Sequence, residues 1–143
     1  MAYAVADINQ DGILELLLGT TEGLENAEPN SLFTLKEGKP ILLESFWSRS
    51  SGVISADGKI YCEGSDGAAY TILSSFVLDK NADSLRELTY MSSDYSKAEE
   101  KPYFVQMIDG KKHYIAKDEF WDFVEAFQNP PKKMKLKVFS IEG

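Results

Sequence analysis

The chain has 143 residues, of which 43% are hydrophobic, so it is long enough to bury one core and too short for us to expect a second independent domain. Its 23 acidic and 15 basic residues give a formal net charge of -8, which argues against the basic surface that nucleic acids and anionic membranes require. With one cysteine, Cys62, and one histidine, His113, the chain has no internal disulfide and too few ligands for a structural zinc site of its own. Hard, oxygen-ligated metals suit this composition.

The first half of the chain is a series of short apolar or β-branched segments that end at turn signals. Residues 2–6 and 13–19 are apolar runs on either side of a polar turn, and each has the length of a strand. Residues 19–31 (GTTEGLENAEPNS) are polar and rich in turn formers, so we expect a loop there. Two hairpins should follow, one turning at Glu37-Gly38 and one at Asp57-Gly58, because Gly, and Asp-Gly in particular, tolerates the positive φ of tight turns.

The second half repeats this pattern and then changes to a helix. The long run AAYTILSSFVL meets SLRELTYM across residues 79–83, residues 92–102 (SSDYSKAEEKP) read as a loop, and a further hairpin turns at Asp109-Gly110. A helix near 117–128 is predicted by acids in its first turn, by the stop at Pro130-Pro131, and by apolar residues on one face, namely Phe120, Phe123, Val124 and Phe127. The lysine-alternating C-terminus reads as a final strand, suited to a sheet edge.

The pattern as a whole predicts a mainly β, β-rich α+β domain over residues 1–143. We expect an antiparallel meander, similar to a propeller blade or an open barrel, with the one helix near the C-terminus. No stretch approaches the roughly 20 apolar residues of a membrane span. Met1 leads straight into the first apolar run without a signal peptide, so we expect either a cytoplasmic protein or part of a longer exported protein whose signal or lipid anchor has been removed.

The turn after the first strand gathers negative charge at regular spacing. Numbered from its first acid, oxygen-bearing side chains fall at positions one, three, five and nine, which are Asp7, Asn9, Asp11 and Glu15. Gly12 stands at position six, where calcium loops turn sharply, and Ile13 at position seven can offer its carbonyl. Without a cation, carboxylates this close would repel one another, whereas a hard ion such as Ca²⁺ turns the repulsion into coordination.

Two common calcium motifs do not fit this turn. An EF-hand loop closes with a bidentate Glu at position twelve, and position twelve here is Leu18. The helical flanks of EF-hands and dockerins are also missing, because the neighbouring runs have the character of strands.

The pattern D-x-N-x-D-G-x-x-E-L-x-x-G over residues 7–19 resembles the calcium-binding hairpin of FG-GAP repeats, the blade motif of integrin-α-type β-propellers. The resemblance covers about 20 residues and implies a structural Ca²⁺ ion between two antiparallel strands. It implies that the ligands are the side chains of Asp7, Asn9, Asp11 and Glu15 and the carbonyl of Ile13. More loosely, the order of segments is similar to uncharacterised domains of secreted or lipid-anchored bacterial proteins, which implies an extracellular or cell-surface location.

Residues 79–87 weakly repeat the acidic pattern of residues 7–15, and we call this segment the echo turn. Aligning FVLDKNADSLREL with YAVADINQDGILEL places oxygen-bearing side chains at the same four positions, which are Asp79, Asn81, Asp83 and Glu87. Ser84 replaces the glycine, and it would be strained if the turn needs φ > 0 there. Asx residues also make good hairpin turns by bonding their own backbone, and this simpler interpretation is favoured for the echo. It does not explain why Glu15, already inside an apolar strand, is acidic.

Other residues offer weaker functional signals. Neither His113 nor Cys62 has the neighbouring residues that would make it a catalytic base or nucleophile. We expect His113 to be an exposed strand residue and Cys62 to be a small buried residue. Trp47, Arg49, Tyr61 and Tyr70 suit a platform that stacks on a sugar or docks a peptide, although aromatic residues on strands more often fill the core. Glu44 and Glu63 could be paired as the two acids of a glycosidase, but with 23 acids in the chain some pair can always be found, and nothing in their spacing sets the separation that such an enzyme needs.

These observations favour a non-catalytic, calcium-stabilised binding or spacer module of an exported bacterial protein, with an unidentified protein or carbohydrate as its ligand. The alternatives are a hydrolase acting on carbohydrate or peptide, and a metal-free structural domain whose acidic turn is only a turn. No Walker loop, dinucleotide fingerprint, G-x-S-x-G elbow or H-E-x-x-H motif is present in the sequence.

Overall fold

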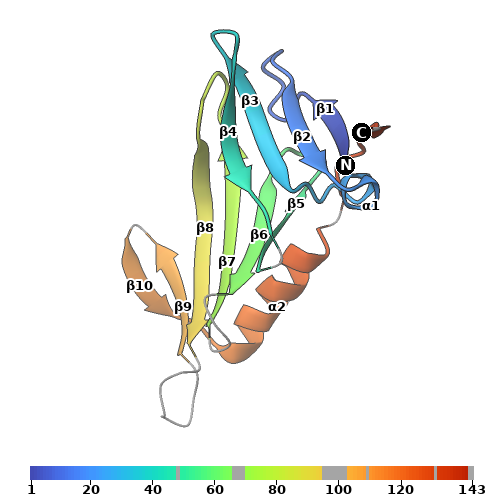
Figure 1. The fold of residues 1–143 in the computed structure, drawn as a ribbon. Coiled ribbons are helices and arrows are strands. Elements are labelled where there is room, and N and C mark those ends of the chain that lie inside the picture. The colour runs from blue at the N-terminus through green and yellow to red at the C-terminus, as the bar shows by residue number, and fades with distance from the viewer. Residues whose placement is uncertain (48, 66–69, 95–102, 109, 131, 142–143) are drawn as a thin grey trace.

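A computed structural model describes the chain except for residues 48, 66–69, 95–102, 109, 131 and 142–143 (Figure 1). The described strands form two antiparallel sheets. The first sheet has the order β11-β1-β2-β3-β4 and consists of β1 (Ala2–Ala6), β2 (Glu15–Gly19), β3 (Ser31–Lys36), β4 (Lys39–Ser45) and β11 (Phe139–Ser140). The second sheet has the order β10-β9-β8-β7-β6-β5 and consists of β5 (Ser50–Ile54), β6 (Ile60–Ser65), β7 (Tyr70–Leu78), β8 (Leu85–Asp94), β9 (Tyr103–Ile108) and β10 (Lys111–Tyr114).

The predicted β-rich antiparallel meander is therefore confirmed, since strands consecutive in the chain are neighbours within each sheet and β11 alone among the described strands returns to pair with a distant one, β1. Within the described residues the sheets stay open and do not close into a barrel. The predicted hairpin turns have positive φ at their glycines, 77° at Gly38, 85° at Gly58 and 74° at Gly110. Glu37 also has a positive φ, 53°, whereas Asp57 does not. Local turn chemistry thus sets the register of these hairpins.

Two hydrophobic clusters hold together three layers, namely the first sheet, the second sheet and the long helix near the C-terminus. The first cluster lies between the sheets and contains side chains of both, including Leu17 and Leu32 of the first sheet and Ile54 and Ile60 of the second. The second cluster lies on the other face of the second sheet, where helix α2 (Lys117–Gln128) packs against Leu73 and Met91 through the buried residues Phe120, Val124 and Phe127. Figure 1 shows α2 along the lower part of that sheet. The helix predicted near 117–128 is confirmed.

Three segments differ from the sequence predictions. Part of the expected loop 19–31 is a short helix, α1 (Thr21–Glu25), whose start is capped by the Thr20 hydroxyl, which accepts the Gly23 N–H at 2.9 Å. A helix of five residues has no apolar periodicity to detect, so the sequence pattern missed it.

Residues 92–94, the first part of the loop predicted at 92–102, belong to β8, and the rest of that predicted loop lies outside the described residues. The final strand is shorter than expected. Only Phe139–Ser140 pairs with β1, at the edge of the sheet, while Met134, Leu136 and Val138 turn toward the first cluster. Neither of the two helices in the described part of the chain has the length and apolar character needed to cross a membrane.

Candidate functional site

The acidic turn between β1 and β2 is organised by its own carboxylates. The two oxygens of Asp7 accept the N–H groups of Asp11 at 3.1 Å and Gly12 at 2.9 Å. Asp11 Oδ1 accepts the N–H of Ile13 at 2.9 Å. Gln10 and Gly12 have φ of 60° and 86°, so the backbone folds tightly around these side chains. Each carboxylate oxygen bonded in this way keeps a further lone pair that can face a cation.

Asn9 is the member of the turn whose hydrogen bonding is incomplete. Its Nδ2 donates to Asp11 Oδ2 and to the backbone oxygen of Asp79, both at 3.1 Å, which fixes the orientation of the amide. Its Oδ1 is buried and has no hydrogen-bond partner. A buried oxygen without a donor is unfavourable unless another group meets it, and a bound cation would do so.

Glu15 is fully buried at the start of β2 and is bonded within the protein. Its Oε2 accepts the Ile8 N–H at 2.9 Å and its Oε1 accepts the Thr34 hydroxyl at 3.1 Å. Burial raises the pKa of Glu15 above its ordinary value, and the nearby carboxylates of Asp11 and Asp7 act in the same direction. Glu15 therefore joins the turn to β3, a structural role that explains an acid within an apolar strand and that the sequence did not reveal.

The turn brings together Asp7, Asn9 and Asp11, while Glu15 is engaged on the core side. Among the described residues, no three His, Cys, Asp or Glu side chains converge as a metal site. An amide is not counted in such a group, so Asn9 Oδ1 and backbone carbonyls would have to complete any coordination shell. Partial burial acts to raise the pKa of Asp11, but N–H groups of Asn81 and Ile13 and the amide of Asn9 outweigh it and hold that pKa below its usual value.

The echo turn between β7 and β8 proves to be the partner of the first turn. The Asn81 N–H donates to Asp11 Oδ2 at 3.0 Å, and the Asp79 backbone oxygen accepts from Asn9. The positive φ of this turn, 60°, falls at Asn81, and Ser84 carries no such strain. Asn tolerates this conformation better than most residues, so a glycine is not needed.

Two of the three acids of the echo turn, Asp79 and Asp83, are paired with cations. Arg86 donates to both oxygens of Asp79, at 2.8 and 3.0 Å, and this pairing holds the pKa of Asp79 below its usual value. Lys36 lies 3.8 Å from Asp83. With Asp79 and Asp83 paired in this way, the echo turn has the contacts of a structural turn, and the interpretation favoured by its sequence agrees with them.

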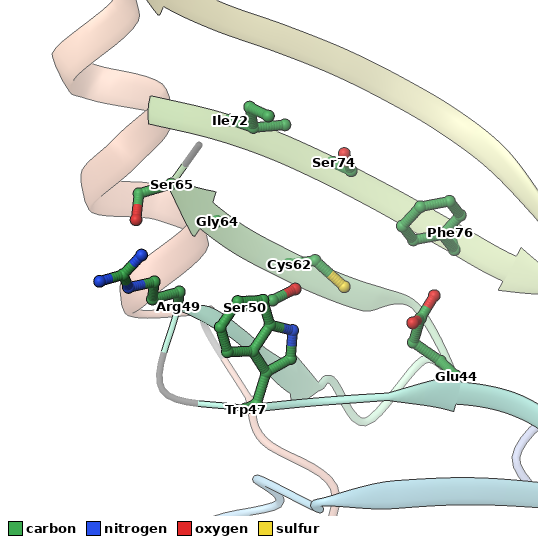
Figure 2. A pocket seen from close by; sticks show the side chains of 10 residues that line it. All are labelled: Glu44, Trp47, Arg49, Ser50, Cys62, Gly64, Ser65, Ile72, Ser74 and Phe76. Carbon is green, nitrogen blue, oxygen red and sulfur yellow. The ribbon is translucent and has the colours of Figure 1, made fainter. Parts of the chain in front are cut away.

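A groove of about 340 Å³ lies between the end of the first sheet and the second sheet, on the face opposite α2 (Figure 2). Trp47, Arg49 and Glu44 line one side of it. The remaining lining comes from β5, β6 and β7, namely Ser50, Cys62, Gly64, Ser65, Ile72, Ser74 and Phe76. Two members of the predicted aromatic platform, Trp47 and Arg49, therefore lie together in a hollow.

The other predicted platform residues lie elsewhere. Tyr61 points to the helix side of the second sheet, where its ring meets Phe127 edge-on at 5.2 Å, and the side chain of Tyr70 lies outside the described residues. Glu63 is on that same helix side and accepts a bond from Gln128 at 3.0 Å, so the sheet separates it from Glu44. The two acids do not face a common substrate position. His113 lies exposed on β10.

Cys62 should react slowly with alkylating agents. Burial, and secondarily the charge of Glu44, raises the pKa of the Cys62 thiol to about 12, so the thiolate that reacts is only about 1 in 10,000 of molecules at pH 8. We expect alkylation by iodoacetamide at pH 8 to be about 1,000-fold slower in the folded protein than in urea. Mass spectrometry of the time course measures this. Glu44→Gln should speed the folded-state reaction while leaving it far below the unfolded rate, whereas equal rates in buffer and urea would contradict the burial of the thiol.

Comparison with protein-family models, with curated proteins and with solved structures finds no match to this chain. Function must therefore be argued from the turn and the groove themselves.

Proposed function

We propose that this chain is a non-catalytic, calcium-stabilised binding or spacer module of an exported bacterial protein. The observation that carries the proposal is the Asn9 Oδ1 atom, which is buried in a turn between two carboxylates and has no hydrogen-bond donor. Oxygens of this kind are the ligands that Ca²⁺ prefers. Asp7, Asn9 and Asp11 would supply side-chain oxygens and Ile13 its carbonyl. Glu15, the fifth predicted ligand, would have to use the lone pairs that its bonds to Ile8 and Thr34 leave free.

The contacts of the turn explain how a bound ion would stabilise the whole fold. Asn9 and Asp11 bond directly to the backbone of the β7–β8 turn, which belongs to the other sheet. A cation that fixes these two side chains would therefore also fix the contact between the sheets. Binding only to the folded state adds RT ln(1 + [L]/Kd), which is about 1.4 kcal/mol when free calcium is about ten times Kd.

Location and metal are linked in this proposal. Extracellular calcium modules bind at roughly 10⁻⁴ to 10⁻³ M, which matches calcium outside a cell and is far above the level inside one. The excess of 23 acidic over 15 basic residues also favours a divalent cation over an anionic partner.

A thermal melt tests the proposal. In 10 mM calcium the melting temperature should rise by about 4 °C over that in EDTA, because about 1.4 kcal/mol is spread over a domain of this size. Magnesium should have little effect, since it needs a smaller, strictly octahedral site. Asp11→Asn should abolish the rise.

Asp83→Asn is the matched control for that melt. It removes the same charge from an exposed acid of the echo turn, which lies 3.8 Å from Lys36 and is not among the proposed ligands. The calcium-induced rise should survive in this variant. A wild-type protein whose melting temperature is the same in calcium and in EDTA would favour the metal-free structural domain instead.

A further inference from the structure

The groove beside Trp47 has a definite length and direction. Along β7 its lining runs from Ile72 to Phe76, four residue steps, which corresponds to about 13 Å of strand. The side chains that point into it alternate with those that face α2, as Ile72, Ser74 and Phe76 do with the buried Leu73 and Ser75. An extended chain of three or four residues has the same length.

Opposite charges stand at the two ends of this groove. Arg49 lies at the Ser65 end, where its backbone oxygen accepts the Ser65 N–H at 2.9 Å, and Glu44 lies at the other end beside Cys62 and Phe76 (Figure 2). Neither side chain has an ion-pair partner among the described residues. Asp79 and Arg86, by contrast, neutralise each other directly. Within the part of the chain that the structure describes, Arg49 without an ion-pair partner and Glu44, which accepts a bond from the neighbouring Ser45 N–H, thus stand at opposite ends of one groove.

The floor of the groove between these two charges contains both apolar and polar groups. Trp47 is 60% exposed, which is unusual for a side chain of its size and leaves a broad apolar surface open to a ligand. Ile72 and Phe76 add apolar surface from β7, while the hydroxyls of Ser50 and Ser74 can bond to peptide groups. Such a floor suits an apolar side chain on a polar backbone.

We propose that the groove binds a short peptide of three or four residues with free termini, its ammonium group at Glu44 and its carboxylate at Arg49. An apolar side chain in the middle of the peptide would lie against Trp47 and Phe76. A neutral sugar would leave both full charges of the groove without a counter-charge. The inference rests on the proposed function in that it assigns a ligand to the binding module, but no residue of the acidic turn lines the groove.

Fluorescence of Trp47 provides the test. The chain has two tryptophans, and Trp121 lies on α2, so the Trp121→Phe protein reports on Trp47 alone. Titration with the tetrapeptide Ala-Leu-Leu-Ala should saturate with a Kd of about 0.1–1 mM, as expected for a small ligand in an open groove. Acetylating its amino end, or amidating its carboxyl end, should each weaken binding at least fivefold.

Charge variants assign each end of the peptide. Glu44→Gln should weaken binding of the free peptide and remove the penalty of acetylation, and Arg49→Gln should do the same for amidation. Glu119→Gln and Lys111→Gln change the same charges at exposed positions on α2 and β10 and should leave the affinity unchanged. Circular dichroism of each variant checks that it is folded.

Three results would overturn this inference: no change in Trp47 fluorescence up to 10 mM peptide, equal affinity for the free and the capped peptides, or tighter binding of the neutral sugar chitotriose. The titrations are repeated in EDTA and in calcium. A calcium-dependent melt without peptide binding would overturn the peptide site alone, and peptide binding without a calcium effect would overturn the calcium site alone.

Discussion

Replacing Gly58 by alanine should cost about 3 kcal/mol of unfolding free energy, a large effect for the addition of one methyl group. A Cβ at this position would lie 2.4 Å from the backbone oxygen of Ile8, and backbone atoms cannot swing aside as a side chain can. The φ of +85° at Gly58 adds the strain of a left-handed conformation. Because Ile8 lies inside the acidic turn, the same change should also disturb the Asp7–Glu15 geometry.

Gly38→Ala separates these two causes. Gly38 has φ of +77°, close to that of Gly58, but a Cβ there would meet nothing within 4 Å. This variant should lose only the conformational part, about 1 kcal/mol. Urea denaturation of both proteins measures the difference. Equal losses at the two positions would show that Gly58 does not press against Ile8.

Phe120→Ala should destabilise the protein by about 3–5 kcal/mol, since it removes a large, fully buried aromatic ring and leaves a cavity. Phe120 belongs to the cluster that joins α2 to Leu73 and Met91 of the second sheet. The expected result is a lower urea midpoint, with α2 separating from the sheet at an early stage of unfolding.

The neighbouring Trp121 provides the control for this prediction. It is 42% exposed and contacts Phe120 edge-on, with ring centroids 5.8 Å apart. Trp121→Ala should therefore cost about 1 kcal/mol. If Trp121→Ala were as destabilising as Phe120→Ala, the orientation of α2 described here would be wrong.

The elements that could be predicted from the sequence are those set by local chemistry. The turn at Glu37-Gly38 and the turn at Gly58 needed residues that tolerate positive φ, and α2 showed its apolar face by spacing alone. The division of the strands into two sheets was not predictable, because it depends on which apolar faces meet across the core. Helix α1 was missed because one turn stabilised by Thr20 has no periodic signal.

The candidate site divides in the same way. The spacing of the acids in residues 7–15 is a local feature and could be read from the sequence. The hydrogen bonds that join Asn9 and Asp11 to a turn 70 residues away could not be predicted from it. The role of Glu15 as the partner of Thr34 depends likewise on the pairing of β2 with β3 in the first sheet, which the acidic pattern does not reveal.

The groove was half visible from the sequence. Tyr61 and Cys62 are consecutive residues of one strand, so their side chains lie on opposite faces of the sheet. A binding platform on the face of Cys62 could therefore not contain Tyr61. This alternation was the sequence signal that could have separated Tyr61, which faces α2, from the groove that contains Trp47 and Arg49.

We propose that the Asp7–Glu15 turn binds calcium and that its contact with Asn81 joins the two sheets. The most direct measurement is a calcium titration of ¹⁵N-labelled protein followed by NMR of its backbone amides. We expect saturable shifts at one site, with a Kd of roughly 10⁻⁴ to 10⁻³ M. They should centre on the amides of Asp11, Gly12 and Ile13 and extend to Asn81 across the contact between the turns. Small, unsaturated shifts scattered over exposed acids, with none at Gly12 or Asn81, would contradict the proposal.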